Sequence, residues 1–322
     1  MVSTNLFAAT AYLLVYHGSR DPRPGQAVER LAQFVREHLE TSLGSVSLRP
    51  GSGVAEVPDP PSRRPVLNPF ERLPSAVCGG NPPAGEGWPR AIHPLPLVGT
   101  ACLETGALPL HQQIVNFGQR AAAAGVTDIR IVPIFLLRGV HVLRDLPMEV
   151  QAAQPCLPGL SLTLTPPLGD HPGLRNLVQT RLQTTTAEAW LLLAHGSRRP
   201  EGNRTIHALA QALGGAVAYW AVPPHLDTQI IHLIQQGVQR LAILPYFLFT
   251  GSTTDAITQR AEELAERFPD LGIHLLPPLG PSPDLAQLVV DLAMGRGPVS
   301  SPQPTVSLKR MARRSADVGS VA

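Results

Sequence analysis

The stretch LLVYHGSRDPRPGQAVERLAQFV, from Leu13 to Val35, returns later in the chain as LLLAHGSRRPEGNRTIHALAQAL, from Leu191 to Leu213. Each copy has a short apolar run, then His-Gly-Ser-Arg, then apolar residues at helical spacing. A second pair of blocks follows in the same order, because Ile129 to Pro147 is matched by Leu241 to Ile257. Two matching blocks in the same order indicate an internal duplication.

Strands and helices are expected to alternate in both copies. In the first copy we predict strands at about 12–16, 96–102, 129–135 and 160–165, and helices at about 26–40 and 110–124. In the second copy the strands are expected at about 191–194, 216–221, 241–247 and 273–276. This alternation favours parallel sheets with right-handed crossovers. The predicted fold class is α/β, with two tandem flavodoxin-like, doubly wound parallel-sheet domains.

The repeat also sets the expected domain boundaries. We predict an N-terminal half over 1–183 and a C-terminal half over 184–295. The first half carries an insert at 44–92 that the second half lacks, with ten prolines and seven glycines in those 49 residues. Such a composition buries little apolar surface, so we expect an irregular excursion there. The basic, Ser- and Pro-containing segment 296–322 is expected to be disordered.

Composition excludes several classes of function. With 43% hydrophobic residues, 16% charged residues and a net charge of +2, the chain has the balance of a globular protein and is too close to neutral for nucleic acid to be its main partner. Lys309 is the only lysine. The chain therefore has no Walker-type ATP loop, and no lysine within the predicted domains for a Schiff base.

Cysteine usage and hydropathy indicate the compartment. The three cysteines, Cys78, Cys102 and Cys156, are far apart and form no C-x-x-C pair, which is typical of a reducing environment. The apolar stretch from Leu6 to Tyr16 is too short to span a membrane and runs directly into His17, so we interpret it as a strand. We predict a cytoplasmic protein with no membrane and no nucleic-acid partner.

Three residues that can do chemistry follow three different predicted strands. His17, Glu104 and His141 each come after a strand end, and in a doubly wound fold the loops at the carboxyl ends of the strands meet in one crevice. Two imidazoles and a carboxylate could hold a divalent transition metal, or they could accept protons near neutral pH. A purely structural role of His17, bonded to backbone, is the competing interpretation.

The two copies differ at these positions. His17 returns as His195 in an identical HGSR setting, whereas His141 is matched by Thr253 and Glu104 by about Ala221. A site that needs two histidines is therefore complete only in the first half.

Arginines accompany the histidines in the same loops. Guanidinium groups beside a metal-binding crevice suit a substrate with several carboxylates, which they hold through paired hydrogen bonds. We expect Arg23 and Arg144 to be solvated. The predicted substrate-binding residues are Ser19, Arg20, Arg138 and Gly139.

These motifs together resemble the sirohydrochlorin chelatases, which insert iron or cobalt into a tetrapyrrole without ATP. The resemblance rests on HGSR after the first strand, on Glu104, and on PIFLLRGVHVLRDLP at 133–147, and it runs from about Leu13 to Leu292 apart from the insert. It implies two flavodoxin-like halves around one cleft, and a lyase that serves siroheme or cobalamin biosynthesis. His17, His141 and Glu104 would be both catalytic and metal-binding. Fe²⁺ or Co²⁺ would be a substrate and no cofactor would be permanently bound.

The resemblance leaves several alternatives open. Because the two halves are fused, a monomer with one active site is expected, and His195 would then be a relic or a structural residue. The sequence does not distinguish iron from cobalt. A non-catalytic carrier of metal or tetrapyrrole, or a chelatase for another tetrapyrrole, is the main alternative function. A phosphohistidine enzyme using His17 is disfavoured, because no arginine immediately precedes the His-Gly pair.

Overall fold

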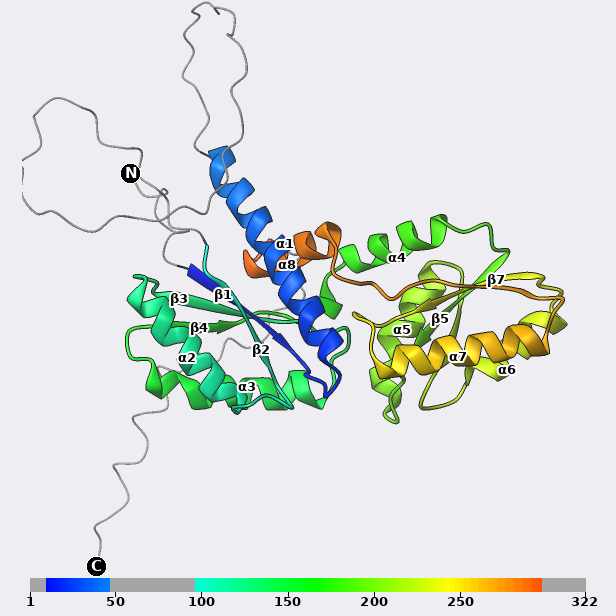
Figure 1. Ribbon diagram of the computed structural model, residues 1–322, viewed down its shortest axis with the longest axis horizontal. Helices are drawn as coiled ribbons and strands as arrows, with labels where there is room; N and C mark the ends of the chain where they lie inside the picture. Colours follow the sequence, from blue (N-terminus) through cyan, green and yellow to red (C-terminus); the bar gives the residue numbers. More distant parts are fainter. Residues whose placement is uncertain (1–9, 47–95, 297–322) are drawn as a thin grey trace, which may run out of the picture.

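The computed structural model describes residues 10–46 and 96–296, in which strands and helices alternate as predicted (Figure 1). The first half contains β1 (Thr10–Tyr16), α1 (Pro22–Val46), β2 (Val98–Cys102), α2 (Leu110–Ala123), β3 (Asp128–Pro133), a π-helical turn η1 (His141–Asp145), α3 (Leu146–Ala153), a 3-10 turn η2 (Gln154–Cys156), β4 (Ser161–Leu164), a 3-10 turn η3 (Leu168–Asp170) and α4 (Gly173–Gln183). The second half contains β5 (Ala189–Ala194), α5 (Pro200–Ala212), β6 (Ala216–Tyr219), α6 (Leu226–Gln235), β7 (Arg240–Pro245), α7 (Ser252–Arg267), β8 (Gly272–Leu275) and α8 (Pro283–Ala293).

Each half has one four-stranded parallel sheet. The strand orders are β2-β1-β3-β4 and β6-β5-β7-β8, so the same topology occurs twice. Corresponding strands also pair alike: β1 runs beside β2 from the pair Tyr12–Val98, and β5 runs beside β6 from the pair Leu191–Ala216. The predicted α/β class with two parallel sheets is confirmed.

The central strands are buried on both faces, which explains their continuous apolar sequences. In β1, Ala11, Leu13 and Val15 face a core formed with α2 and α3, while Tyr12 and Leu14 face a core formed with α1 and α8. The second of these cores continues without a break onto β5, β6 and β7 of the other sheet. The two halves therefore share one apolar core, and each has a second core on its outer face.

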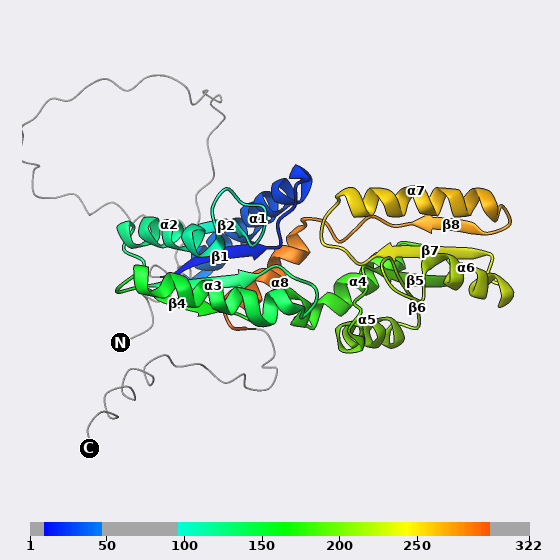
Figure 2. The same cartoon turned by 90° about the horizontal axis from the view of Figure 1, so that it is seen from below.

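The last helix of each half crosses to the other half (Figures 1 and 2). Helix α8 contacts α1 and β3 of the first half, and the Arg130 guanidinium donates to the Ala293 carbonyl at 2.6 Å. In the opposite direction, Arg175 of α4 donates to the Ala212 carbonyl at 3.0 Å, and Arg181 donates to the Leu279 carbonyl at 2.7 Å. The division at 183/184 follows the sequence repeat, but the packing is reciprocal, so we expect the halves to depend on each other for stability.

A surface ion pair adds a second link between the halves. Arg23, near the start of α1, binds Asp21 at 2.6 Å and Asp255 of α7 at 2.5 Å. Hydrogen bonding to Arg23 lowers the pKa of Asp21 to about 2 and also lowers the pKa of Asp255. The expectation that Arg23 is simply solvated was wrong, because the acidic partner comes from a helix 232 residues away in the sequence.

Two segments differ from the sequence-based prediction. Helix α1 covers 25 residues, from Pro22 to Val46, and is longer at both ends than predicted. The segment carrying His141 was predicted to be a loop, but His141 begins a π-helical turn that continues into α3.

Apart from residues 44–46, which belong to α1, the predicted insert lies outside the described residues, as does the predicted tail from 297 onward. No helix in the described part of the chain combines the length and apolarity needed to cross a membrane.

Candidate metal and tetrapyrrole site

The structure brings His17, Glu104 and His141 together at the carboxyl ends of three adjacent strands. They follow β1, β2 and β3, and β1 lies between the other two in the sheet. The Nε2 atoms of His17 and His141 each lie 3.9 Å from an oxygen of the Glu104 carboxylate, and the two imidazole rings meet edge to face with centroids 4.8 Å apart. Glu104 is therefore placed between the two histidines.

A tight contact between two loops holds Glu104 in this position. The Leu103 and Glu104 amides donate to the Tyr16 and His17 carbonyls at 2.9 and 2.8 Å, which extends the β1–β2 pairing beyond the strands. Gly18 has a φ of +93°, and a Cβ at this position would lie only 2.0 Å from the Glu104 carbonyl oxygen. Glycine at position 18 is thus required by both its backbone conformation and the close approach.

Both histidines use their other ring nitrogen for a hydrogen bond outside the cluster. His17 Nδ1 lies 3.0 Å from the Gly18 carbonyl oxygen, and His141 Nδ1 lies 2.8 Å from Asp145 Oδ2. Because both partners are acceptors, the hydrogen-bond network assigns the proton of each neutral ring to Nδ1. The Nε2 lone pairs are then free to face Glu104 and a shared ligand.

The geometry fits a divalent transition metal. One potential ligand atom from each of the three residues lies within 4.8 Å of the other two, and this is the one group of three such residues found within 10–46 and 96–296. Metal–ligand distances near 2.0–2.2 Å require neighbouring ligand atoms about 3.3 Å apart, so small side-chain movements would close the site. The side chains are 51%, 50% and 37% exposed, which leaves an open face for exchange of the metal.

The predicted substrate-binding residues have different surroundings. Arg20 is exposed and makes no ion pair within the described residues, whereas Arg138 forms a bidentate pair with Asp170 at 2.6–2.9 Å that raises the pKa of its guanidinium. The Ser19 hydroxyl accepts from the Asp21 amide at 3.1 Å. A Cβ on Gly139 would meet nothing within 4 Å, so its surroundings leave space beside His141. The roles of Ser19, Arg20, Arg138 and Gly139 stay predictions.

The second half has the same loop architecture without the same side chains. The Ala221 amide donates to the His195 carbonyl at 2.9 Å, which is the counterpart of the bond between Glu104 and His17. The Asp255 amide donates to the Gly251 carbonyl as the Leu143 amide does to Gly139, so Thr253 corresponds to His141. The two loops of the second half thus keep the backbone hydrogen bonds of the first half, although the carboxylate and the second imidazole are absent.

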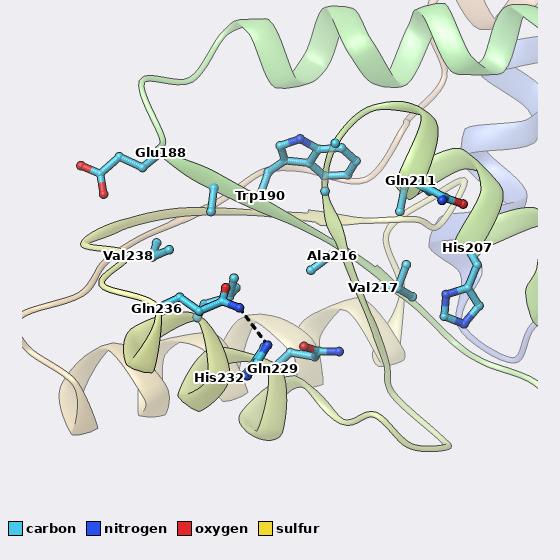
Figure 3. Close-up of a pocket in the computed structure, with 15 residues that line it drawn as sticks. Glu188, Trp190, His207, Gln211, Ala216, Val217, Gln229, His232, Gln236 and Val238 are labelled. Atoms are coloured by element: carbon cyan, nitrogen blue, oxygen red, sulfur yellow. Dashed lines mark hydrogen bonds between the residues drawn. The ribbon is translucent and has the colours of Figure 1, made fainter.

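A separate cavity of about 620 Å³ lies along the free edge of β6 (Figure 3). Its walls come from α5, α6 and the amino ends of β5 and β6, and they include Trp190, His207, Gln211, His232 and Gln236. Helix α5 beside this cavity has 13 residues, whereas the corresponding helix α1 of the first half has 25. In the first half, the longer α1 covers the matching edge, and Arg36 donates to the Val98 carbonyl at 3.1 Å. The cavity belongs to the second sheet and lies by the amino ends of its strands, whereas the metal-ligand cluster lies at the carboxyl ends of strands in the first sheet.

Comparison with known proteins identifies the family. The CbiX family model matches residues 92–185 and 189–294, one match for each half, and the chain therefore belongs to the CbiX family. The chain is 27% identical over 183 residues to a sirohydrochlorin cobaltochelatase and 28% identical over 155 residues to a sirohydrochlorin ferrochelatase, both of Priestia megaterium. These matches cover 52% and 44% of this chain and 58% of each relative, so the chain spans little more than half the length of the curated relatives it matches.

Solved structures share the fold over about nine-tenths of this chain. SirB from Bacillus subtilis with Fe³⁺ superposes with a TM-score of 0.62 at 17% identity, covering 90% of this chain and 96% of that one. DR2241 from Deinococcus radiodurans, described as a multi-domain protein with similarity to chelatases, superposes with a TM-score of 0.57 at 20% identity, covering 89% of this chain and 55% of that one. The arrangement of two linked parallel-sheet halves is therefore shared with these structures.

Proposed function

We propose that this protein is a sirohydrochlorin chelatase, a lyase that inserts Fe²⁺ or Co²⁺ into sirohydrochlorin without ATP. The observation that carries the proposal is the exposed cluster of His17, Glu104 and His141 in a chain of the CbiX family. The relatives named as a cobaltochelatase and a ferrochelatase support both the substrate and the choice of metals. Two SirB structures of the same fold, one with Fe³⁺ and one with cobalt, contain the same two elements.

The histidines would hold the incoming metal weakly. Two imidazole nitrogens and one carboxylate leave coordination positions open, and the exposure of all three side chains gives the macrocycle access to the metal. A closed set of four protein ligands would trap the metal, whereas a chelatase must release it. An open three-ligand site therefore suits transfer better than storage.

Glu104 would receive a proton during the reaction. Metal insertion replaces the two inner N–H protons of sirohydrochlorin, so two protons leave the macrocycle for each divalent metal that enters. The Glu104 carboxylate lies 3.9 Å from each histidine, next to the position that the metal would occupy, and is half-exposed. It can accept a pyrrole proton and pass it to solvent, and a histidine that has released the metal can accept the second.

Arginines would bind the carboxylate arms of the substrate. The Arg20 side chain is exposed and close in sequence to His17, so it is free to pair with a substrate carboxylate. Arg138 could bind a further arm only by sharing or leaving Asp170. Ser19 and Gly139 complete the proposed binding surface, with a hydroxyl donor and with open space respectively.

The second half would contribute to the fold and to the shared core but would have no reaction centre of its own. Ala221 and Thr253 offer no carboxylate and no imidazole, so His195 alone cannot reproduce the first-half cluster. We accordingly propose one active site per chain, in the N-terminal half (1–183), and a degenerate C-terminal half (184–295). A monomer in the cytoplasm, serving siroheme or cobalamin biosynthesis, is the biological setting that goes with this activity.

The direct test is an anaerobic chelation assay. Purified protein is mixed with sirohydrochlorin and either Fe²⁺ or Co²⁺, and the absorbance of the macrocycle is followed against a reaction without protein. The proposal predicts faster metal insertion with at least one of the metals, and the faster metal is the one that the purified protein prefers. Tight binding of metal or tetrapyrrole with no acceleration would instead establish a carrier, and acceleration only with another macrocycle would change the substrate.

A further inference from the structure

A carboxylate outside the ligand cluster contacts one of the two histidines. Asp145 Oδ2 lies 2.8 Å from His141 Nδ1, four residues along the chain, and both side chains are 37% exposed. The two residues are the first and last of the π-helical turn η1, which the Leu146 amide closes by donating to the His141 carbonyl. Turns of this kind are rare and occur frequently at functional sites.

We propose that Asp145 is a positioning residue that prepares His141 for the metal. By accepting the Nδ1 proton, the carboxylate fixes the ring in the tautomer whose Nε2 lone pair faces Glu104, and its negative charge makes that nitrogen a stronger donor. This inference rests on the proposed function, because it gives Asp145 a task only if His141 binds the metal substrate.

Comparison of the two halves supports a functional link between Asp145 and His141. In the second half Thr253 corresponds to His141, whereas the buried Leu146 and Ala153 match the buried Ile257 and Leu264, so the π-helical turn adds one residue and Asp145 lies level with Ala256. The helix can thus be built in the second half without an aspartate at this position. The aspartate is present in the half that has the histidine, and it is replaced in the half that lacks it.

The two histidines of the cluster have unequal support. His17 Nδ1 faces the Gly18 carbonyl, a neutral acceptor, whereas His141 Nδ1 faces an ionisable carboxylate. A carboxylate partner strengthens the imidazole as a metal ligand more than a carbonyl does, since it stabilises the positive charge that the bound ring acquires. His141 is therefore the stronger of the two imidazole ligands, and the removal of Asp145 should weaken metal binding through His141 alone.

A second histidine–carboxylate pair provides a matched control on the same helix. His111 Nδ1 lies 2.9 Å from Glu149 Oε2, and Glu149 also accepts from the His111 amide at 2.7 Å, which joins the start of α2 to α3. This pair has nearly the same geometry and a similar exposure, 35% and 31%, but neither residue belongs to the ligand cluster. Its loss would disturb α3 without touching the partner of His141.

The experiment measures Co²⁺ binding to the full chain without tetrapyrrole, by its visible absorption, together with the His141 tautomer by ¹⁵N NMR and the melting temperature. Asp145→Ala should weaken Co²⁺ binding about 10- to 100-fold and shift the proton of His141 away from Nδ1. Asp145→Asn, which keeps an oxygen acceptor but loses the charge, should keep the tautomer and lose less affinity. Glu149→Gln should leave Co²⁺ affinity unchanged even if it lowers the melting temperature.

The inference is overturned if Asp145→Ala binds Co²⁺ as the wild type does, or if Glu149→Gln weakens binding equally, because the effect would then come from α3 as a whole. His141→Ala separates this inference from the proposed function. Wild-type binding that His141→Ala abolishes and Asp145→Ala leaves intact would remove only the role of Asp145. A wild type that binds no Co²⁺ would overturn the metal site and the inference together.

Discussion

Replacing Gly18 by alanine tests whether the close contact between the first two loops is what positions Glu104. The new methyl group would lie 2.0 Å from the Glu104 carbonyl oxygen, and a carbon–oxygen contact normally needs about 3.3 Å. The obstacle is backbone that is itself bonded to the His17 carbonyl, so no side-chain rotation can relieve it. The loop that carries Glu104 must move away by more than about 1 Å.

Two effects of different size follow from this geometry. The φ of +93° costs an alanine roughly 1–2 kcal/mol of stability, as it would at any left-handed position. The displacement acts on function, because a ligand site tolerates errors of only about 0.5 Å. A misplacement near 1 Å commonly costs about 100-fold in rate. We therefore expect Gly18→Ala to lose most of its chelation rate and Co²⁺ affinity while its free energy of unfolding falls only modestly.

Two other glycines separate backbone strain from the clash. Gly125 has a φ of +79° and open space around it, so Gly125→Ala should show the cost of the left-handed conformation alone and keep its activity. Gly196, the counterpart of Gly18, has a φ of +83° and would place its methyl 2.6 Å from Val222, so Gly196→Ala should lower stability without a direct clash with the loop that carries Glu104. Thermal unfolding, Co²⁺ titration and the chelation assay are compared across the three variants. A Gly18→Ala protein with wild-type Co²⁺ affinity and rate would refute the reasoning.

Three further changes test other parts of the structure. Arg20→Ala should raise KM for sirohydrochlorin more than it lowers kcat, because the exposed guanidinium would bind substrate; an unchanged KM in steady-state assays would remove that role. Burial lowers the pKa of His171 below 6.5, so as the pH drops below about 6.5 the unfolded chain takes up this proton first and the stability of the protein should fall. His171→Asn, which can still accept from the Gly173 amide, should make that fall smaller in urea titrations. An unaltered dependence of stability on pH would contradict this role of His171. Leu285→Ala, at a fully buried position of α8, should lower the free energy of unfolding by about 2–5 kcal/mol. Because α8 packs on the first half, calorimetry should show both halves melting together at a lower temperature. A separate, unshifted transition of the first half would argue against the exchange of helices.

Local sequence patterns predicted the sheet elements well. The apolar runs that form β1, β3, β5 and β7 are buried on both faces, so their pattern is strong, and each observed strand lies within about two residues of its predicted ends. The convergence of His17, Glu104 and His141 was also predictable, because parallel strands place all their carboxyl ends at one edge. These inferences needed only the order of the elements.

Features that depend on contacts distant in the sequence could not be predicted in the same way. The crossing of α4 and α8 depends on which apolar face each helix covers, and either half would bury it equally well by pattern alone. The pairing of Arg138 with Asp170 and of Arg23 with Asp255 depends on that packing. Asp145 had a local signal, since it lies four residues after His141, but the signal has meaning only on a helix, and this segment was predicted to be a loop.

The central claim is that the first half alone carries a chelatase site. It is tested most directly by anaerobic insertion of Co²⁺ or Fe²⁺ into sirohydrochlorin by His141→Ala and His195→Ala, measured beside the wild type under identical conditions. The account predicts that His141→Ala loses the protein-dependent rate and that His195→Ala retains most of it. A His195→Ala protein that loses the rate while His141→Ala retains it would contradict the account.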